Sequence, residues 1–370
     1  MTTMLSKATS WSDVRDLVND QHKLNFDFFA NPSMIRMGDD GTVCAIDNEK
    51  HVHELGFTDI GLQQFATKVG IPSQYASKLA TIDKELLAAN FNTMLKMNVD
   101  PNKDLLVRAT NKPSGPCMRA MLSDRYGILD NHEFVGAVAD AFVATGLDQS
   151  VKIEDLHLGD RSFHIRLTDE HGKKDAMTAA KEWEQSTGHY LMSSRGMAHD
   201  FLYPMLHLSN SEIGASSVKL EGGVYRVVCT NGMVAPANID NSFKRRHFGF
   251  TQNELTAYVV EKAQGILRNA QAFTGDFIDA QFTEIKEPED TIERLIAKHR
   301  ITKANEKSIR SELGLTTGGW PKTDRLIGTG NAITAYDMAN AITATARDLK
   351  DYDARVDLER IAATFVTHKN

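Results

Sequence analysis

The sequence predicts an α+β protein in which an antiparallel sheet has helices packed on one face and lies between helical N- and C-terminal regions. Three observations support this class. Apolar residues recur at helical spacing in the first hundred residues and again in the last third. Between them, apolar and polar residues alternate as they do in half-buried strands. The strands lack the regular strand–helix–strand order of a doubly wound sheet, which favours the α+β class.

Residues 1–100 are expected to form a mostly helical N-terminal region. Ser12, Thr58 and Asp83 are of types that cap helices, and each precedes a stretch with helical spacing. Pro72 suits the first turn of a further helix. This region therefore predicts several short helices in succession.

Residues 101–275 are expected to form an α+β core with an antiparallel sheet. Apolar residues at 105–107 and 118–122 flank the turn-rich stretch 111–116, which predicts a β-hairpin. Asn131 can cap a helix that ends near Thr145. Further strands are expected at 151–156, 162–167, 205–209 and 217–229, the last broken by a turn near Gly222 and Gly223, with a loop or excursion at 169–200.

Residues 276–370 are expected to form a helical C-terminal region. Apolar residues recur at helical spacing in three separate stretches, 253–273, 288–300 and 331–366. The whole chain is thus divided into three regions whose boundaries rest on changes of hydrophobic period.

The composition is typical of a folded globular protein and argues against a disordered, membrane or secreted one. With 41% apolar and 25% charged residues, the chain lies well clear of disordered compositions. No stretch approaches the roughly 20 apolar residues of a membrane span, and the start lacks a signal-peptide core, so a cytoplasmic protein without membrane contact is expected. The three cysteines have no metal or redox spacing, and neither a catalytic centre nor a cofactor is expected.

One segment opposes the net charge of −7, and it is the main candidate for a binding site. Between Lys219 and Phe250 five basic and two acidic residues give a local charge of +3. Basic residues neutralise phosphates and aromatic rings stack on bases, which is what single-stranded nucleic acid requires. A solvated loop followed by core aromatics explains the same pattern. The candidate residues here are Arg226, Phe243, Lys244, Arg245, Arg246, His247 and Phe248.

Other signals for chemistry are weaker. Asn210, Ser211 and Glu212 are expected to fix a loop through side-chain hydrogen bonds, with Glu212 as a lone acid in a site as the alternative. His51 and His53 lie two residues apart, as two ligands on a strand would, but have no evident third ligand.

A metal-dependent nuclease is a further alternative. Glu284 and Lys286, with Asp276 or Asp279 upstream, loosely match the carboxylates that hold Mg²⁺ and a lysine near the scissile phosphate. No glycine-rich phosphate loop of the Walker type is present, so ATP dependence is not supported.

Two segments resemble a known family. Residues 119–131, and residues 206–234 with their Asn-Ser-Glu and Cys-Thr-Asn-Gly elements, together with Arg246, His247 and Gly249, are similar to the phage- and plasmid-like family called domain of unknown function nine hundred and thirty-two. The resemblance extends over about residues 105–365. It implies an origin in a mobile element and no particular activity.

The leading expectation is a single-stranded DNA binding and annealing protein that forms a homo-oligomer. Phages and plasmids commonly encode such proteins, in which a small antiparallel sheet is backed by a helix, and annealing needs no covalent chemistry. Arg119 and Arg125 are further candidates for phosphate contacts. The alternative from another class is a counter-defence protein that binds and inhibits a host enzyme, with its negative charge as a steering field.

Overall fold

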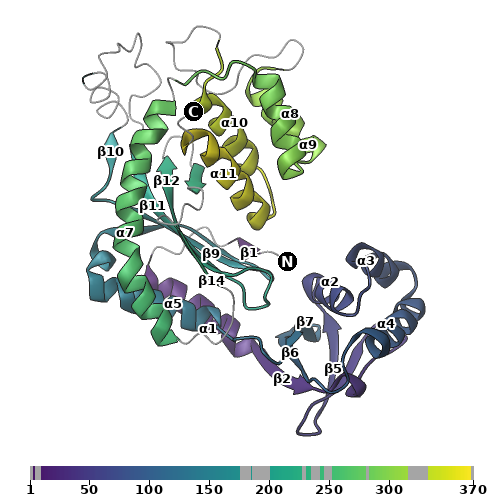
Figure 1. Cartoon of the computed structure of the whole chain (residues 1–370). Helices are drawn as coiled ribbons and strands as arrows, with labels where there is room; N and C mark the ends of the chain where they lie inside the picture. The colour runs from purple at the N-terminus through teal and green to yellow at the C-terminus, as the bar shows by residue number, and fades with distance from the viewer. Residues whose placement is uncertain are drawn as a thin grey trace.

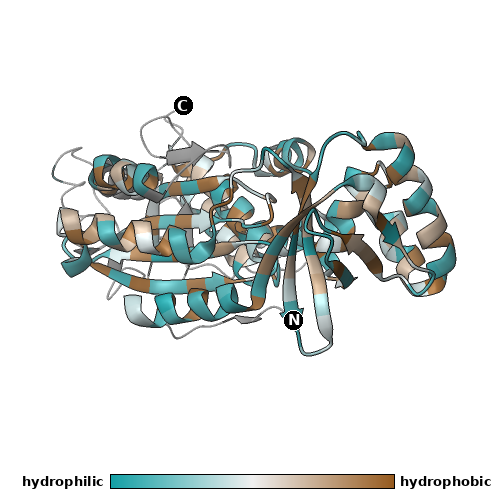
Figure 2. Ribbon diagram, turned by 90° about the horizontal axis from the view of Figure 1, so that it is seen from below, coloured by the Kyte–Doolittle hydropathy of each residue, from teal (hydrophilic) through white to brown (hydrophobic). Residues whose placement is uncertain are grey.

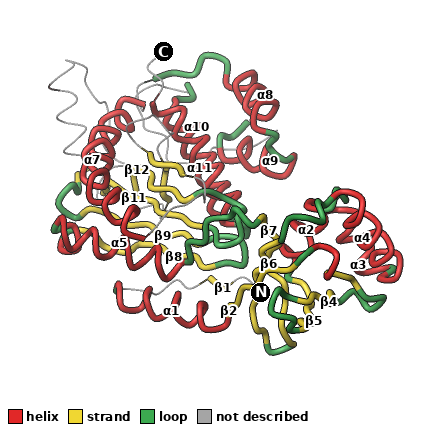
Figure 3. Tube along the Cα trace, turned by 60° about the horizontal axis from the view of Figure 1, so that its bottom comes forward, coloured by secondary structure: helices red, strands yellow, loops and turns green. Residues whose placement is uncertain are grey.

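The chain folds into two β-sheets, each covered by helices, in the computed structural model (Figure 1). The structure describes residues 3–4, 10–175, 185, 201–226, 231–234, 242–245, 252–280, 283–315 and 332–367. The six-stranded sheet and its helices form one lobe, and the eight-stranded sheet with the remaining helices forms the other (Figures 1 and 3).

The six-stranded sheet has the order β2-β6-β7-β5-β4-β3. All its pairs are antiparallel except β5 and β7, which run parallel. Helices α2, α3 and α4 bury Phe65, Leu79 and Phe91 against it. The elements are β2 (Asn25–Ala30), β3 (Ile35–Met37), β4 (Val43–Ile46), β5 (Val52–Phe57), α2 (Asp59–Lys68), α3 (Ser73–Ile82), α4 (Lys84–Asn98), β6 (Leu105–Lys112) and β7 (Gly115–Ser123), with a short 3₁₀ turn at Pro32–Met34.

The eight-stranded sheet is antiparallel throughout, in the order β1-β8-β9-β11-β12-β13. Two short strands lie off this path, because β10 pairs with β11 and β14 pairs with β12. The strands are β1 (Thr3–Met4), β8 (Val151–Leu158), β9 (Phe163–Asp169), β10 (Lys174–Asp175), β11 (Phe201–Asn210), β12 (Val218–Arg226), β13 (Asn231–Val234) and β14 (Ser242–Arg245).

One face of this sheet is covered by α1 (Trp11–Leu24), α5 (Asn131–Thr145) and α7 (Gln252–Asp279). Phe134 and Phe142 of α5 pack with Phe163 of β9 and with Val259 of α7 in one apolar core. Figure 2 shows the pattern behind this packing: apolar residues concentrate on the strands and alternate with hydrophilic ones around the helices.

The opposite face is covered by α11 (Tyr352–Thr367), which pairs with α10 (Ala335–Arg347) in a second layer (Figure 1). Helices α8 (Pro288–His299) and α9 (Lys303–Glu312) complete a separate apolar core with these two. Among the described residues, no helix combines the length and the apolar character needed to cross a membrane.

The α+β class and the antiparallel core sheet are confirmed. The helices of residues 1–100 were predicted, but strands β2 to β5 in that region were not. Because β6 and β7 pair with β2 and β5, the boundary placed at residue 100 falls inside one lobe. The sheet also has helices on both faces, because ion pairs of Glu359 and Arg360 and the packing of Val356 on Met205 hold α11 on the second face.

The turn predicted near Gly222 and Gly223 is wrong. Strand β12 continues through both residues, because they pair with Leu206 and Met205 of β11. Most of the predicted excursion at 169–200 lies outside the described residues. In the C-terminal region, helices are confirmed, but the stretch predicted at 331–366 is divided into α10 and α11, and α9 is an addition.

Gly61 marks the closest approach of α2 to the six-stranded sheet. A Cβ atom at this position would lie 2.1 Å from the carbonyl oxygen of Met118 in β7. We expect Gly61→Ala to lower the free energy of unfolding by about 1–3 kcal/mol, as overpacking does. Gly265→Ala in α7 is the matched control, because its Cβ would meet no atom within 4 Å. Equal thermal stability of the two variants would contradict this account of the α2–β7 contact.

Candidate functional site

The two segments that resemble the family meet between the lobes, around a buried group of charged residues. We call Asp27, Arg108, Arg119, Asp130 and Glu212 the junction cluster. The Arg108 Nε atom donates to both Asp27 carboxylate oxygens at 3.0 Å, and its guanidinium also pairs with Asp130. Arg119 pairs with Glu212. Arg108 is only 1% exposed, so these ion pairs are shielded from water.

The junction cluster fixes the loop of residues 210–217, which connects β11 to β12. Glu212 Oε1 accepts a hydrogen bond from the Asn131 backbone N–H at 2.8 Å. Arg108 Nη1 donates to the Glu212 carbonyl oxygen at 2.5 Å. Gln64 of α2 donates to the carbonyl oxygen of Ile213 at 2.8 Å. The loop thereby joins the two lobes.

Asn210 and Ser211, which belong to this loop, fix it through their own side-chain hydrogen bonds. Asn210 Nδ2 donates to the Leu129 carbonyl oxygen at 3.0 Å. Ser211 Oγ donates to the Arg161 carbonyl oxygen at 2.7 Å and accepts from the Ala215 N–H at 3.1 Å. The prediction that Asn-Ser-Glu fixes a loop by side-chain hydrogen bonds is confirmed.

Negative charge exceeds positive charge in the junction cluster, since it contains three carboxylates and two guanidinium groups. Burial raises the pKa of Asp27 even though Arg108 lies beside it. Burial disfavours the charged form of Arg108, but Asp27 and Asp130 outweigh it and raise the pKa of this guanidinium. The cluster can therefore accept one more positive charge nearby.

A cavity of about 360 Å³ opens where the loop of residues 210–217 faces α2. We call it the Lys68–Arg161 cavity, because these two are the charged residues among those the structure describes as its lining. The Arg161 side chain is half exposed and pairs with Asp353 at 3.4 Å. The other lining residues are Ile60, Gln63, Gln64, Thr67, Ser73, Met121, Leu122 and Ala215. A cavity with two cations and amide and hydroxyl groups suits an anionic ligand.

The register of β12 and β14 brings basic residues together at a sheet edge. Lys219 lies directly opposite Lys244, and the next residue of β14, Arg245, pairs with Val218 and so belongs to the other face of the sheet. We call this the basic edge. Arg226 lies at the other end of β12, opposite Asn231, about 23 Å from Lys219 at 3.3 Å per residue. The predicted basic segment is thus divided between the two ends of one strand.

The other predicted site residues have different surroundings. Arg119 is 6% exposed and bonded to Glu212, a placement that does not support a contact with a DNA phosphate on the surface. Arg125 is exposed in the turn after β7. Only the backbone of Arg226, Phe243, Lys244 and Arg245 is described, and Arg246, His247 and Phe248 lie outside the described residues.

The residues suggested for a nuclease do not lie on a common strand. Asp276 and Asp279 belong to the last turns of α7, and Glu284 forms an isolated bridge with Thr334. His51 and His53 both contact the carboxylate of Asp47, with His53 Nε2 at 2.8 Å. The hydrogen bond from His53 is the main reason why the pKa of Asp47 falls to about 2.

A second buried polar network holds α11 on the eight-stranded sheet. His164 contacts Asp353 at 3.1 Å and His207 at 3.0 Å, and His207 contacts Glu221 at 3.2 Å. Arg360 Nη2 donates to Glu221 at 2.6 Å, and Arg166 donates to Glu359 at 2.6 Å. Burial lowers the pKa of His207 to about 3, so this histidine is neutral in the folded protein.

Comparison with known proteins identifies a family. The family described as Domain of unknown function (DUF932) matches residues 120–355, more than half of the chain. The chain is a DUF932 protein. No curated protein and no solved structure matches it significantly. The DUF932 region begins within β7 and ends within α11, so it includes Asp130, Glu212, the loop of residues 210–217 and the basic edge.

The junction cluster is shared between the DUF932 region and the preceding lobe, which supplies Asp27, Arg108 and Arg119. Lys68 and Arg161 were not predicted, because isolated cations far apart in the chain form no motif. His22 and His132, which lie close to each other and to Asp130, were not predicted either. The Asp-Asn-His run at 130–132 is the one signal that could have drawn attention to that group.

Proposed function

We propose that this DUF932 protein binds single-stranded DNA along a path from the basic edge to the Lys68–Arg161 cavity. The observation that carries the proposal is the register that sets Lys219 opposite Lys244 beside Arg245, within a chain of net charge −7. Affinity for phosphates depends on such local positive charge, because each contact releases condensed counterions.

The path is continuous along the chain. Val218, opposite Arg245, follows the cavity residue Ala215 by three residues, which limits their separation to about 10 Å. Arg125 is exposed in the turn after β7, three residues after the cavity residue Leu122. We propose Phe243 and Phe248 as the rings on which bases stack, at about 1–3 kcal/mol per base. We propose that the protein comes from a phage or plasmid, forms a homo-oligomer and uses this binding to anneal complementary DNA strands.

Fluorescence anisotropy of a labelled single-stranded oligonucleotide, measured over a range of salt concentrations, tests the path. We expect Lys244→Ala/Arg245→Ala and Lys68→Ala/Arg161→Ala each to weaken binding. Each pair should reduce the slope of log K against log salt by about 1.4, since each lost phosphate contact removes about 0.7.

The control is Lys78→Ala/Lys96→Ala, which removes the same charge from exposed positions on α3 and α4. It should leave the salt slope unchanged, and thermal unfolding establishes that every variant is folded. Equal slopes in all three double variants would reject the path. An absence of binding at low salt by the folded wild-type protein would reject DNA binding and favour an inhibitor of a host enzyme, which a pull-down then tests.

A further inference from the structure

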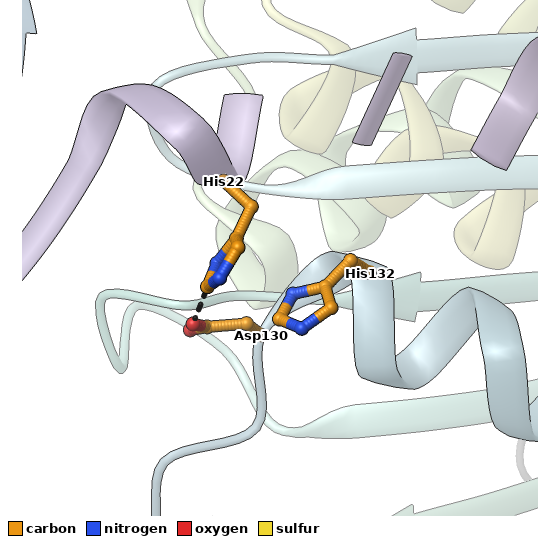
Figure 4. Close-up of side chains that lie close together, drawn as sticks. All are labelled: His22, Asp130 and His132. Carbon is orange, nitrogen blue, oxygen red and sulfur yellow. Dashed lines mark ion pairs between the residues drawn. The ribbon is translucent and has the colours of Figure 1, made fainter. Parts of the chain in front are cut away.

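Three side chains converge beside the junction cluster, one from α1, one from α5 and one from Asp130, the residue that precedes α5 (Figure 4). His22 extends from the last turn of α1 toward the carboxylate of Asp130, and His132 lies next to both in the first turn of α5. Their potential ligand atoms all lie within 4.8 Å of one another. The two imidazole rings are tilted by 37°, with centroids 3.8 Å apart.

The separations suit a small cation. His22 Nδ1 lies 3.5 Å from Asp130 Oδ2. Two ligands bound at about 2.0–2.1 Å in a tetrahedron lie about 3.3 Å apart, so this pair already has the spacing of a zinc site. The His22 side chain is 47% exposed and can rotate to shorten the remaining distances.

Neighbouring residues orient both the Asp130 carboxylate and the His132 imidazole. Arg108 holds Asp130 through Oδ1, which leaves Oδ2 directed at His22. Among the described residues, His132 Nδ1 is buried and has no hydrogen-bond partner. Gln21, beside His22, accepts a hydrogen bond from Asn131 at 2.9 Å and so fixes α1 against the start of α5. Such outer contacts orient metal ligands in proteins.

The charge of the junction cluster gives the second, independent argument. Its three carboxylates outnumber its two guanidinium groups by one, and Asp130 is the carboxylate that reaches the two histidines. A cation bound at this position offsets the excess negative charge.

We propose that His22, Asp130 and His132 bind one divalent transition-metal ion, with Zn²⁺ as the best match. Two imidazoles and one carboxylate are a ligand set that Zn²⁺ accepts, and a water molecule can take the fourth position on the exposed side. The ion connects α1, which lies outside the DUF932 match, to the first turn of the family's helix α5. This site is independent of the proposed DNA path.

Titration of the chelator-treated protein with Co²⁺, a spectroscopic substitute for Zn²⁺, tests the site. We expect a visible absorption band of low-symmetry Co²⁺ that saturates at one ion per chain and disappears when Zn²⁺ is added. We expect His22→Gln and His132→Gln each to abolish the band. His22→Gln changes an exposed side chain, so loss of folding does not confound the result.

The matched control is the double variant His51→Gln/His53→Gln, which removes two histidines that also contact an aspartate. It should keep the band and the stoichiometry. Absence of saturable binding by the folded wild-type protein overturns the proposal. The proposal is also overturned if His22→Gln and His132→Gln keep the band. It is overturned as well if the band is lost only in the control variant.

Discussion

Replacement of Glu212 with alanine is expected to lower the free energy of unfolding by about 3–5 kcal/mol. The change leaves the Arg119 guanidinium buried without its carboxylate partner. It also removes the acceptor of the Asn131 N–H at the start of α5. An uncompensated buried charge costs far more than the ion pair itself contributes, so the effect is large. Denaturant unfolding monitored by circular dichroism measures it.

Two controls separate this effect from a general loss of charge. Asp100→Ala removes the exposed partner of Lys103 and an acceptor of the Asn102 N–H in a surface turn, and it should cost only about 1 kcal/mol. Glu212→Gln keeps the shape of the side chain and one acceptor oxygen, and we expect an intermediate cost. A Glu212→Ala protein as stable as Asp100→Ala would show that the junction cluster does not join the lobes energetically.

Acidification from pH 6.5 to pH 5 is expected to lower the free energy of unfolding by about 1.6 kcal/mol through His207 alone. Burial lowers the pKa of this imidazole to about 3 in the folded protein, against 6.5 for an ordinary histidine. The unfolded chain therefore binds a proton over this range and the folded protein does not, which favours unfolding as the pH falls. The pKa of His164 is also lowered by burial, so it adds to the same trend.

Asp353 of the same network affects stability at lower pH than the histidines do. Hydrogen bonds from His164 and Ser162 outweigh burial and lower the pKa of Asp353 to about 2. The contribution of Asp353 to the free energy of unfolding is fully present above pH 3.8, the ordinary pKa of an aspartate, and is lost only as the pH falls toward 2. Thermal unfolding between pH 7 and pH 5 therefore separates the histidines of this network from Asp353. His207→Gln should flatten the pH dependence, and a slope equal to that of the wild type would contradict the assignment.

The fold was predictable wherever one face of an element is apolar. The helix at Asn131–Thr145 and strand β9 have regular apolar spacing, and both were located from it. Strands β3 and β4 have only three and four residues, too few for a period to be visible. The position of α11 was not predictable, because ion pairs such as Arg166–Glu359 join residues far apart in the chain.

The candidate site was predictable in part for the same reason. Local motifs pointed to the loop of residues 210–217, and its side-chain hydrogen bonds are confirmed. Arg119 was predicted as a phosphate contact from its charge, but tertiary structure buries it against Glu212. Residue type does not tell whether a cation faces water or an internal carboxylate, so DNA binding at the basic edge stays a prediction.

The polar character of the α11 interface has a consequence for synthesis of the chain. Proteins emerge from the ribosome N-terminal end first, at about 5–20 residues per second. Strand β9 thus precedes its partners in α11 by nearly two hundred residues, as the Arg166–Glu359 separation of 193 positions shows. An apolar face left open for that interval would invite aggregation. The face that α11 covers presents His164, Arg166 and Glu221 beside the apolar Met205. Because these polar groups bind water, we expect the nascent chain to aggregate less before α11 has been made than a fully apolar face would allow.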